Sequence, residues 1–262
     1  MHFTTFEGLR VGYRREGKGP ALVLVHGTGG DGAANWEGVT QNLSQDFTVL
    51  RPDYTGSGAT EDDGRALTVE DFAGQVLAAM DHAGIDSATL VGFSLGAAVA
   101  ARIAADQPAR VNKLVLISGF ARLDARLKLQ FELWRDLIAS DRAAMARLVL
   151  LTGFSPDALS SWGFEGVEQA VRDTVQTQDW AGMARQVTVD LTLDVSDAGD
   201  KITASTLVIG CAHDHMVPPA HSRALAASIN GARYAELPTG HLAPMERPDL
   251  VAQALREFLA IA

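Results

Sequence analysis

Cysteine is almost absent from this chain of 262 residues, which contains only Cys211. A single cysteine excludes an intramolecular disulfide and a cluster of thiolate metal ligands within one chain. Because Cys211 ends an apolar run, we expect a small buried side chain there and not a redox-active thiol.

Long hydrophobic runs and an excess of positive charge are absent as well. No segment approaches the roughly 18 uninterrupted apolar residues of a membrane span, and the N-terminal segment has no apolar core of signal-peptide length. We therefore expect a cytoplasmic protein. The formal net charge of -10 argues against nucleic acid as a partner, because nonspecific affinity for phosphates comes from Lys and Arg.

Short β-rich runs alternate with Ala-rich segments of helical period along most of the chain. This pattern is typical of an α/β fold, in which crossover helices join parallel strands and cover both faces of the sheet. The predicted strands span residues 21–27, 47–53, 88–94, 113–119, 205–211 and 232–238. Ahead of them, residues 3–17 predict an antiparallel hairpin at the sheet edge.

Three helices have clear start and stop signals. Residues 68–84 begin with Thr68 and end at a glycine, residues 94–108 end at a proline, and residues 247–260 carry an apolar stripe. These segments lie where an α/β fold requires crossover or covering helices.

The alternation breaks between about residues 120 and 200, where four predicted helices follow one another. They span residues 123–140, 141–153, 164–178 and 180–191. We interpret residues 1–119 and 201–262 as one α/β core, with residues 120–200 as a helical cap. This stretch holds Trp134, Trp162 and Trp180, which either pack it onto the core or line an apolar substrate pocket.

The pattern Gly-x-Ser-x-Gly occurs at residues 92–96, between an apolar strand and a small-residue helix. A serine on such a strand-to-helix turn exposes its Oγ above the sheet, at the positive end of the helix. Ser94 is therefore the candidate nucleophile. A hydroxyl is a poor nucleophile at neutral pH, so the interpretation requires a base and a group that orients the base.

His241 is the best candidate for the base, because it follows the last predicted strand and precedes the C-terminal helix. Asp214 follows the strand 205–211 and emerges at the same sheet edge. The other candidates for the base are less well placed: His26 ends a strand, His82 lies in a helix and His221 opens one.

The loop "VHGTGG" follows the first parallel strand and provides candidates for an oxyanion hole. Acyl transfer builds negative charge on an oxygen, which backbone N–H groups stabilise. We expect these donors to be the amides of Thr28 and Leu95. A phosphate-binding loop is the alternative, but neither a Gly-Lys-Ser/Thr ending nor a full dinucleotide fingerprint is present.

The stretch "CAHDHMVPP" gathers several metal-ligand types, but neighbours along an extended loop point apart and no second ligand cluster completes a shell. We therefore predict no metal site. In this interpretation His213 and His215 are loop residues that flank Asp214.

Three stretches, "VGYRREGKGPALVLVHGTGG", "VGFSLGAAVAARIAADQPARVNKLVLIS" and "PTGHLAPMERPDLV", make the chain resemble the α/β-hydrolase superfamily. Within it, the sequence is similar to the capped esterase and lactonase branch that includes 3-oxoadipate enol-lactonases. The resemblance implies Ser94 as nucleophile, His241 as base and Asp214 as the acidic member, in that superfamily's chain order of Ser, Asp, His. It implies Thr28 and Leu95 as oxyanion donors. It also implies an eight-stranded, mostly parallel sheet flanked by helices, with a helical cap inserted after strand 6.

Two features of the sequence, one turn and one single position, depart from the pattern of the relatives. Their Asp-x-Arg-Gly-x-Gly-x-Ser turn reads "DYTGSGAT" here, with Thr55 in place of the arginine and Ser57 and Thr60 in the later positions. Cys211 stands where relatives usually carry glycine. The glycines of the turn remain, so we expect the turn to survive without its arginine contact.

The resemblance implies a hydrolase that cleaves a carboxylic ester or lactone without a cofactor. Its partner would be a small-molecule substrate with an apolar acyl or ring portion. The same machinery also serves thioester and carbon–carbon bond hydrolysis, perhydrolysis and acyl transfer, and a non-catalytic ligand receptor on this fold is a further alternative. The sequence leaves open whether two copies form a homodimer.

Overall fold

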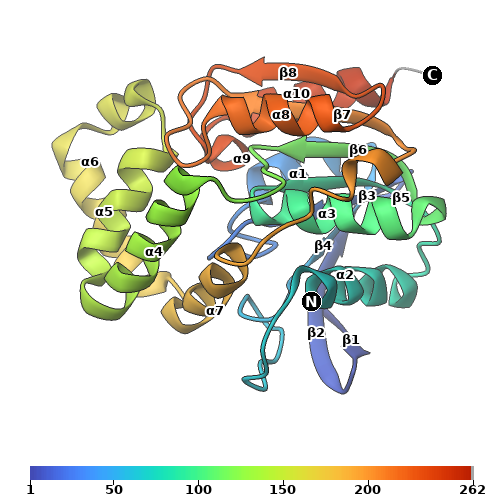
Figure 1. Ribbon diagram of the computed structural model, residues 1–262, viewed down its shortest axis with the longest axis horizontal. Coiled ribbons are helices and arrows are strands. Elements are labelled where there is room, and N and C mark those ends of the chain that lie inside the picture. The colour runs from blue at the N-terminus through green and yellow to red at the C-terminus, as the bar shows by residue number, and fades with distance from the viewer. Residues whose placement is uncertain (261–262) are drawn as a thin grey trace.

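An eight-stranded sheet runs through the protein in the computed structural model, which describes residues 1–260 (Figure 1). The strand order is β1-β2-β4-β3-β5-β6-β7-β8, in which the β1–β2 and β2–β4 pairs are antiparallel and the other described pairs are parallel. The strands are β1 His2–Phe6, β2 Leu9–Glu16, β3 Ala21–Val25, β4 Thr48–Pro52, β5 Ala88–Phe93, β6 Val111–Ile117, β7 Ser205–Cys211 and β8 Arg233–Leu237. The predicted fold and the hairpin at the edge are confirmed.

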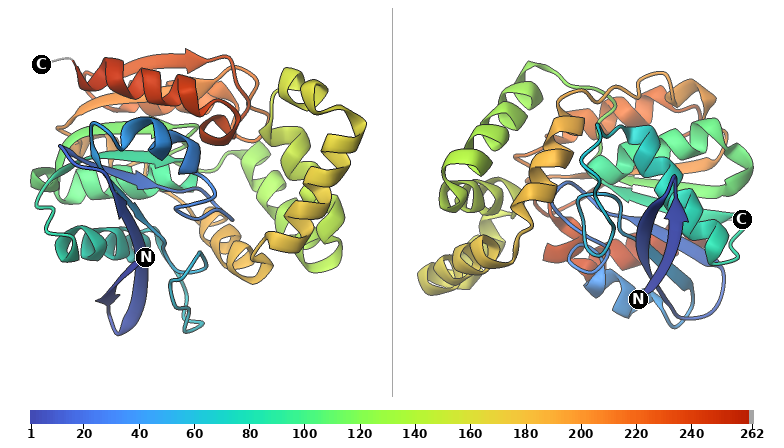
Figure 2. Two further views of the ribbon diagram at one scale, coloured as in Figure 1. Left: turned by 180° about the vertical axis from the view of Figure 1, so that it is seen from behind. Right: turned by 90° about the horizontal axis from the view of Figure 1, so that it is seen from below.

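Helices cover both faces of the sheet, as the apolar strands require. One face is covered by α2, α3 and α8, and the other by α1 and α10, as the two sides of the molecule show (Figure 1, Figure 2). The covering helices are α1 Glu37–Leu43, α2 Val69–His82, α3 Leu95–Asp106, α8 Pro219–Ser228, α9 Ala243–Glu246 and α10 Pro248–Leu259. Short 3₁₀ turns occur at Pro108–Arg110 and Gly199–Lys201.

Four helices are inserted between β6 and β7, and we call them the helical insertion. They are α4 Ala125–Ser140, α5 Arg142–Gly153, α6 Pro156–Thr177 and α7 Trp180–Asp190. In Figure 1 they lie beyond the arrowheads of β6 and β8, so the insertion stands at the carboxyl edge of the sheet. The predicted division into a core and a cap stays a prediction, and residues 261–262 of its last segment lie outside the described residues.

Helix α6 differs from the sequence-based prediction, which began this helix at residue 164. It begins at Pro156, after Ser155 caps it by accepting a hydrogen bond from the Ala158 N–H, and it bends at Gly163. Gly163 has φ 64°, in the left-handed region that glycine adopts without strain. Because Gly163 interrupts the helical pattern, the periodicity of the sequence did not reveal the helical residues before it.

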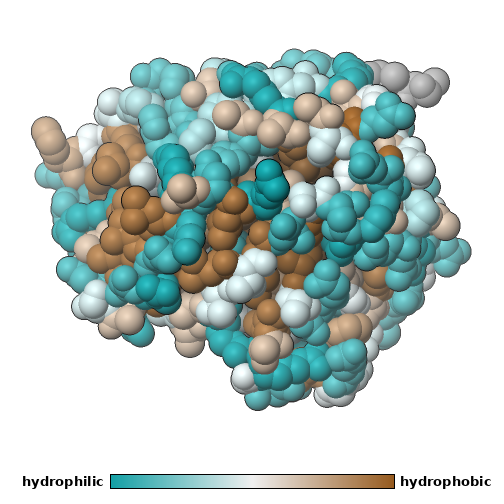
Figure 3. Space-filling model, in the orientation of Figure 1, coloured by the Kyte–Doolittle hydropathy of each residue, from teal (hydrophilic) through white to brown (hydrophobic). Residues whose placement is uncertain are grey.

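The surface of the insertion carries exposed apolar side chains, which gather on its side of Figure 3. They belong to α4, α5 and α6 and include Leu129, Leu133, Leu151 and Phe164. Among residues 1–260, no helix is long and apolar enough to cross a membrane.

Two glycines let β3, β5 and α3 approach one another closely. A Cβ at Gly92 would lie 2.2 Å from the carbonyl oxygen of Gly96. A Cβ at Gly96 would lie 2.3 Å from the carbonyl oxygen of Val25. The atoms that would clash belong to the backbone, so they cannot swing aside.

We expect Gly96→Ala to destabilise the fold by about 3 kcal/mol, the upper end for an overpacked core, because α3 must move off the sheet. Gly64→Ala is a control for the added Cβ alone, because Gly64 has a positive φ, unlike Gly96, but has no atom within 4 Å of the added Cβ. That change should cost about 1 kcal/mol. Urea unfolding of both variants measures the difference, and equal stabilities would contradict the packing argument.

Candidate active site

Ser94 lies on the sharp turn between β5 and α3, with φ 54° and ψ -121°. A non-glycine residue with positive φ is strained, and the surrounding structure must hold it there. Its N–H donates to the carbonyl of Ile117 at 2.9 Å, and its carbonyl accepts from the N–H of Ala97 at 2.8 Å. The turn therefore presents the Ser94 hydroxyl at the amino end of α3, over the carboxyl edge of the sheet.

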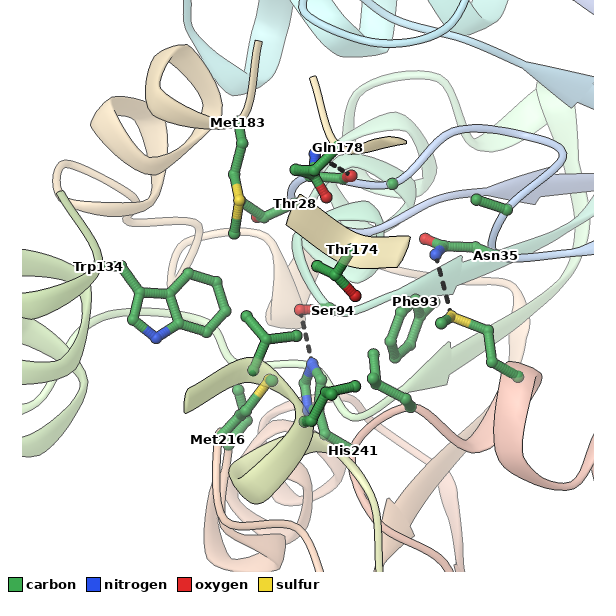
Figure 4. Close-up of a pocket in the computed structure, with 18 of the residues that line it drawn as sticks. Thr28, Asn35, Phe93, Ser94, Trp134, Thr174, Gln178, Met183, Met216 and His241 are labelled. Atoms are coloured by element: carbon green, nitrogen blue, oxygen red, sulfur yellow. Dashed lines mark hydrogen bonds between the residues drawn. The ribbon is translucent and has the colours of Figure 1, made fainter. Parts of the chain in front are cut away.

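Ser94, His241 and Asp214 form one continuous line of hydrogen bonds, although they are far apart in the sequence. The Nε2 of His241 lies 3.0 Å from the Oγ of Ser94 (Figure 4). The Nδ1 of His241 lies 2.7 Å from Oδ2 of Asp214. A carboxylate accepts only, so Nδ1 donates to Asp214 and Nε2 is left to accept from the serine hydroxyl. All three residues are buried.

Both oxygens of Asp214 are occupied, which fixes the carboxylate. While Oδ2 faces His241, Oδ1 accepts from the backbone N–H groups of Met216 at 2.9 Å and Val217 at 2.7 Å. The turn after β7 thus aims one oxygen at the imidazole and satisfies the other.

Glu246 holds the loop that carries His241, and sequence reasoning did not single it out. Its carboxylate accepts from the Gly240 N–H at 3.1 Å and from the Ser155 hydroxyl at 2.7 Å. Ser155 precedes α6, so this carboxylate joins the His241 loop to the helical insertion.

The other histidines that competed as bases have different partners. His82 Nδ1 lies 2.8 Å from the Tyr13 hydroxyl, and His221 faces Asp124 at 3.3 Å. His26 is buried, stacks on Tyr54, and has a pKa lowered by burial. None of the three forms a hydrogen bond with Ser94 among the described residues.

The stretch "CAHDHMVPP" forms a turn in which Asp214 is buried between two exposed histidines. His213 and His215 are exposed, and residues 1–260 hold no cluster of His, Cys, Asp and Glu suited to a metal. Cys211 is buried beside the Ser118 hydroxyl, and burial raises the pKa of its thiol to about 12. A thiol with that pKa stays protonated and unreactive near neutral pH.

The loop predicted as the oxyanion hole lies against the serine. A Cβ at Gly27 would lie 3.0 Å from the Cβ of Ser94. The N–H of Leu95 begins α3 and so has no acceptor within the helix. The N–H of Thr28 makes no hydrogen bond among the described residues. Two unpaired donors therefore flank the serine, as oxyanion binding requires.

Residues in and just before α7 hold this loop, and they were missed from the sequence. Asp190 Oδ2 accepts from the Thr28 hydroxyl at 2.7 Å, and Gln186 Oε1 accepts from the Gly29 N–H at 2.8 Å. Gln178 Nε2 donates to the Gly29 carbonyl at 2.9 Å. Asp190 is buried, and burial raises its pKa to about 7. Its place in a helical pattern gave no sign of this contact.

Thr55, which stands where relatives carry arginine, is buried and makes local contacts. Its N–H donates to the Oε1 of Gln75 at 2.8 Å, and its hydroxyl accepts from the Gln75 Nε2 at 2.8 Å. The Ser57 hydroxyl donates to the Gly30 carbonyl at 2.7 Å. The turn at residues 53–60 is therefore held by amide and hydroxyl hydrogen bonds, where relatives have an arginine.

A cavity of about 160 Å³ opens beside Ser94, between the core and the insertion (Figure 4). Two of the three insertion tryptophans, Trp134 and Trp180, line it, and Trp162 packs edge-on against the lining residue Phe154. Among the described residues that form the lining, none is Asp, Glu, Lys or Arg. The cavity walls are mostly apolar, with His241 as their one titratable imidazole.

Three arginines of the insertion lie outside this lining. Arg126 donates to the carbonyls of His215 and Met216, Arg135 pairs with Asp136 at 2.9 Å, and Arg147 faces Glu168 at 3.8 Å. All three side chains are exposed on the surface and do not line the cavity.

Comparison with known proteins agrees with this geometry. A family model described as the alpha/beta hydrolase fold matches residues 20–248. The pyrrolizixenacetamide deacetylase of Xenorhabdus hominickii is 52% identical over 251 residues, which cover 95% of this chain and 94% of that protein.

Solved structures of hydrolases have the same fold as this chain. The enol-lactonase from Burkholderia xenovorans LB400 superposes with a TM-score of 0.88 at 28% identity, covering 98% of this chain and 99% of that one. A thermophilic esterase from Thermogutta terrifontis gives a TM-score of 0.85 at 25% identity, covering 98% and 96%. The chain belongs to the α/β-hydrolase family, and the predicted superfamily and its hydrolase class are confirmed.

Replacing Asp190 tests whether its burial makes the stability of the fold depend on pH. The pKa is raised from 3.8 to about 7, so the folded chain keeps a proton that the unfolded chain loses, and stability falls as pH rises from about 4 to about 7. Asn does not titrate. We expect Asp190→Asn to lose less stability between pH 4.5 and pH 8 than the parent, by up to about 3 kcal/mol.

Urea unfolding at the two pH values measures this effect. Asp200→Asn is the matched control, because Asp200 is an exposed carboxylate ten residues further along. If the parent and Asp190→Asn lose equal stability between pH 4.5 and pH 8, the pKa of Asp190 is not raised by burial.

Proposed function

We propose that the protein is a serine hydrolase that cleaves a neutral carboxylic ester or amide through an acyl-enzyme on Ser94. The observation that carries this proposal is the line of hydrogen bonds from Ser94 through His241 to Asp214. It supplies a nucleophile, a base within reach of its proton, and a carboxylate that orients the base.

In this mechanism His241 takes the proton of Ser94 as the Oγ attacks the substrate carbonyl. Asp214 holds the imidazole in the tautomer that can accept and stabilises the imidazolium that forms. The N–H groups of Thr28 and Leu95 stabilise the oxyanion. Collapse of the tetrahedral intermediate expels the alcohol or amine, which receives the proton from His241. Water then attacks the acyl group, with His241 again as the base.

The names of two relatives support an amide or ester as the bond that is cleaved. The 52% identical protein is named as a deacetylase of an acetamide, whereas the enol-lactonase at 28% identity is named for a lactone. The higher identity favours removal of an acyl group, acetyl among them, from an amide or ester over the opening of a lactone ring. The proposal thus departs from the ester or lactone expected from the sequence, because it adds an amide and disfavours a lactone.

The chemistry of the cavity suggests the kind of substrate. We propose that α4–α7 act as a cap, and that the lining from Phe131, Trp134 and Trp180 packs on an apolar acyl or ring portion. A carboxylate on the substrate would be buried there without a cationic partner, at a cost of several kcal/mol. The net charge of -10 disfavours the approach of anions further.

Substitutions within the triad test the mechanism. Ser94→Ala should lower kcat by several orders of magnitude, and Asp214→Asn by about 10⁴, because the imidazole then takes the wrong tautomer. Hydrolysis of p-nitrophenyl acetate measures both. His213→Ala and His215→Ala are matched controls beside Asp214 and should stay close to the parent. Substantial turnover in Ser94→Ala, or loss of activity in the two controls, would overturn the scheme.

A pair of substrates tests the preference for neutral molecules. Because 4-acetoxyphenylacetamide and 4-acetoxyphenylacetate differ in one amide against one carboxylate, remote from the acetyl group, they isolate the charge. We expect kcat/KM to be at least about 10-fold higher for the amide-bearing ester, since the carboxylate finds no cation in the lining. Equal rates, or a preference for the anion, would rule out the neutral cavity as the determinant of specificity.

A further inference from the structure

We propose that helix α7 positions the oxyanion hole, with Asp190 and Gln186 holding the segment that carries the Thr28 N–H. The insertion would then be part of the geometry of catalysis as well as a cover over the cavity. This inference rests on the proposed function, because Thr28 must be an oxyanion donor for its position to matter.

The Thr28 peptide lies between a part of the loop held by the core and a part held by α7. On the core side, Asn35 Oδ1 accepts from the Gly27 N–H at 2.9 Å. On the other side, Gln186 Oε1 accepts from the Gly29 N–H at 2.8 Å. Asp190 fixes Thr28 itself by accepting from its hydroxyl at 2.7 Å. The Thr28 N–H is the group left free between these anchors.

A glycine-rich loop needs such anchors. Gly27, Gly29 and Gly30 surround Thr28, and glycine loses more backbone freedom on ordering than other residues. Gln186 reaches further into the core, because its Nε2 donates to the Ser57 hydroxyl at 2.7 Å, which in turn donates to the Gly30 carbonyl at 2.7 Å. Figure 4 shows Gln178, just before α7, bonded to the same loop. Helix α7 therefore contacts the loop at several successive peptides.

The burial of Asp190 indicates that it does more than pack. It is fully buried, and its Oδ1 has no hydrogen-bond partner among the described residues. A buried carboxylate with an unpaired oxygen is costly, and an apolar side chain would fill the position at lower cost. The bond to Thr28 is the contact that an apolar residue could not replace.

Among the described residues, no Lys, Arg or His is a cause of the shifted pKa of Asp190, which burial raises and the bond from Thr28 lowers. Tyr54, from the segment after β4, is the titratable group that senses its charge, and the Tyr54 hydroxyl donates to the His26 carbonyl at 2.5 Å. His26 is buried, with burial lowering its pKa, so the neutral imidazole brings no cation to the carboxylate. Asp190 is thus a positioning residue that acts through Thr28, not a group that touches substrate.

The expected effect lies in the rate of the chemical step. The oxyanion forms only in the transition state, so a displaced Thr28 amide should lower kcat and leave KM nearly unchanged. Displacement of a reacting group by about 1 Å can cost about 100-fold in rate.

A double-mutant cycle tests this coupling with p-nitrophenyl acetate as the probe. Asp190→Val and Thr28→Val each remove one partner of the bond, and each should lower kcat by about 10- to 100-fold with KM within about threefold. The double variant should be no slower than the slower single variant, because both changes break the same contact. Asp190→Asn, which keeps an acceptor for the Thr28 hydroxyl, should recover most of kcat. Asp200→Val is the matched control on the surface.

Other outcomes would overturn the inference. Losses that multiply in the double variant, a change in KM alone, or full kcat in Asp190→Val would each show that Asp190 does not act through Thr28. If Asp190→Val does not fold, Gln186→Met serves in its place, since it removes the acceptor for the Gly29 N–H and should lower kcat without raising KM.

The failure of this inference is separable from failure of the proposed function. Labelling of the parent protein by a fluorophosphonate reports whether Ser94 is an active nucleophile. An unlabelled and inactive parent would contradict the proposed function, whereas a labelled, active parent with an unaffected Asp190→Val would contradict only the role of α7.

Discussion

The whole site depends on the close approach of β3, β5 and α3 around Ser94. Gly92 and Gly96 have no room for a Cβ against neighbouring backbone, so the strand-to-helix turn can be sharp enough to hold Ser94 at φ 54°. That strained turn places Ser94 in the cavity lining and leaves the Leu95 amide without an acceptor in α3. The loop with Thr28 ends β3 and meets the serine because β3 and β5 are neighbours in the sheet.

The carboxyl ends of the parallel strands bring the remaining groups to the same place. Asp214 follows β7 and His241 follows β8, and these strands are paired in register. Parallel pairing thus converts three distant positions in the chain into a line of hydrogen bonds of 3.0 Å and 2.7 Å. The helical insertion closes this edge with an apolar wall and anchors the loops of Thr28 and His241.

The sequence was informative wherever function follows from strand ends and short motifs. Ser94, Asp214 and His241 could be chosen because each follows an apolar strand, and the strand pattern alone predicted the parallel sheet. The short helices α1 and α9 were missed, because elements of seven and four residues carry little periodicity. Asp190, Gln186 and Glu246 were missed for another reason: their partners are set by how the insertion docks, which no local pattern encodes.

The departures from the family pattern also needed three-dimensional contacts to be understood. Thr55 and Gln75 satisfy each other where relatives carry arginine, and Cys211 fills a buried position beside Ser118. Arg126, Arg135 and Arg147 of the insertion have partners of their own and lie outside the cavity lining, and the described lining holds no Asp, Glu, Lys or Arg. The insertion thus contributes uncharged side chains to the cavity lining, while the Ser94–His241–Asp214 line lies at the carboxyl edge of the sheet.

The most direct measurement is peptide mapping by mass spectrometry after reaction with p-nitrophenyl trimethylacetate, whose bulky acyl group is released slowly. The account predicts one trimethylacetyl group per chain, on Ser94, formed together with an initial burst of p-nitrophenol. An acyl group on another residue, or release of p-nitrophenol with no acyl group on the protein, would contradict it.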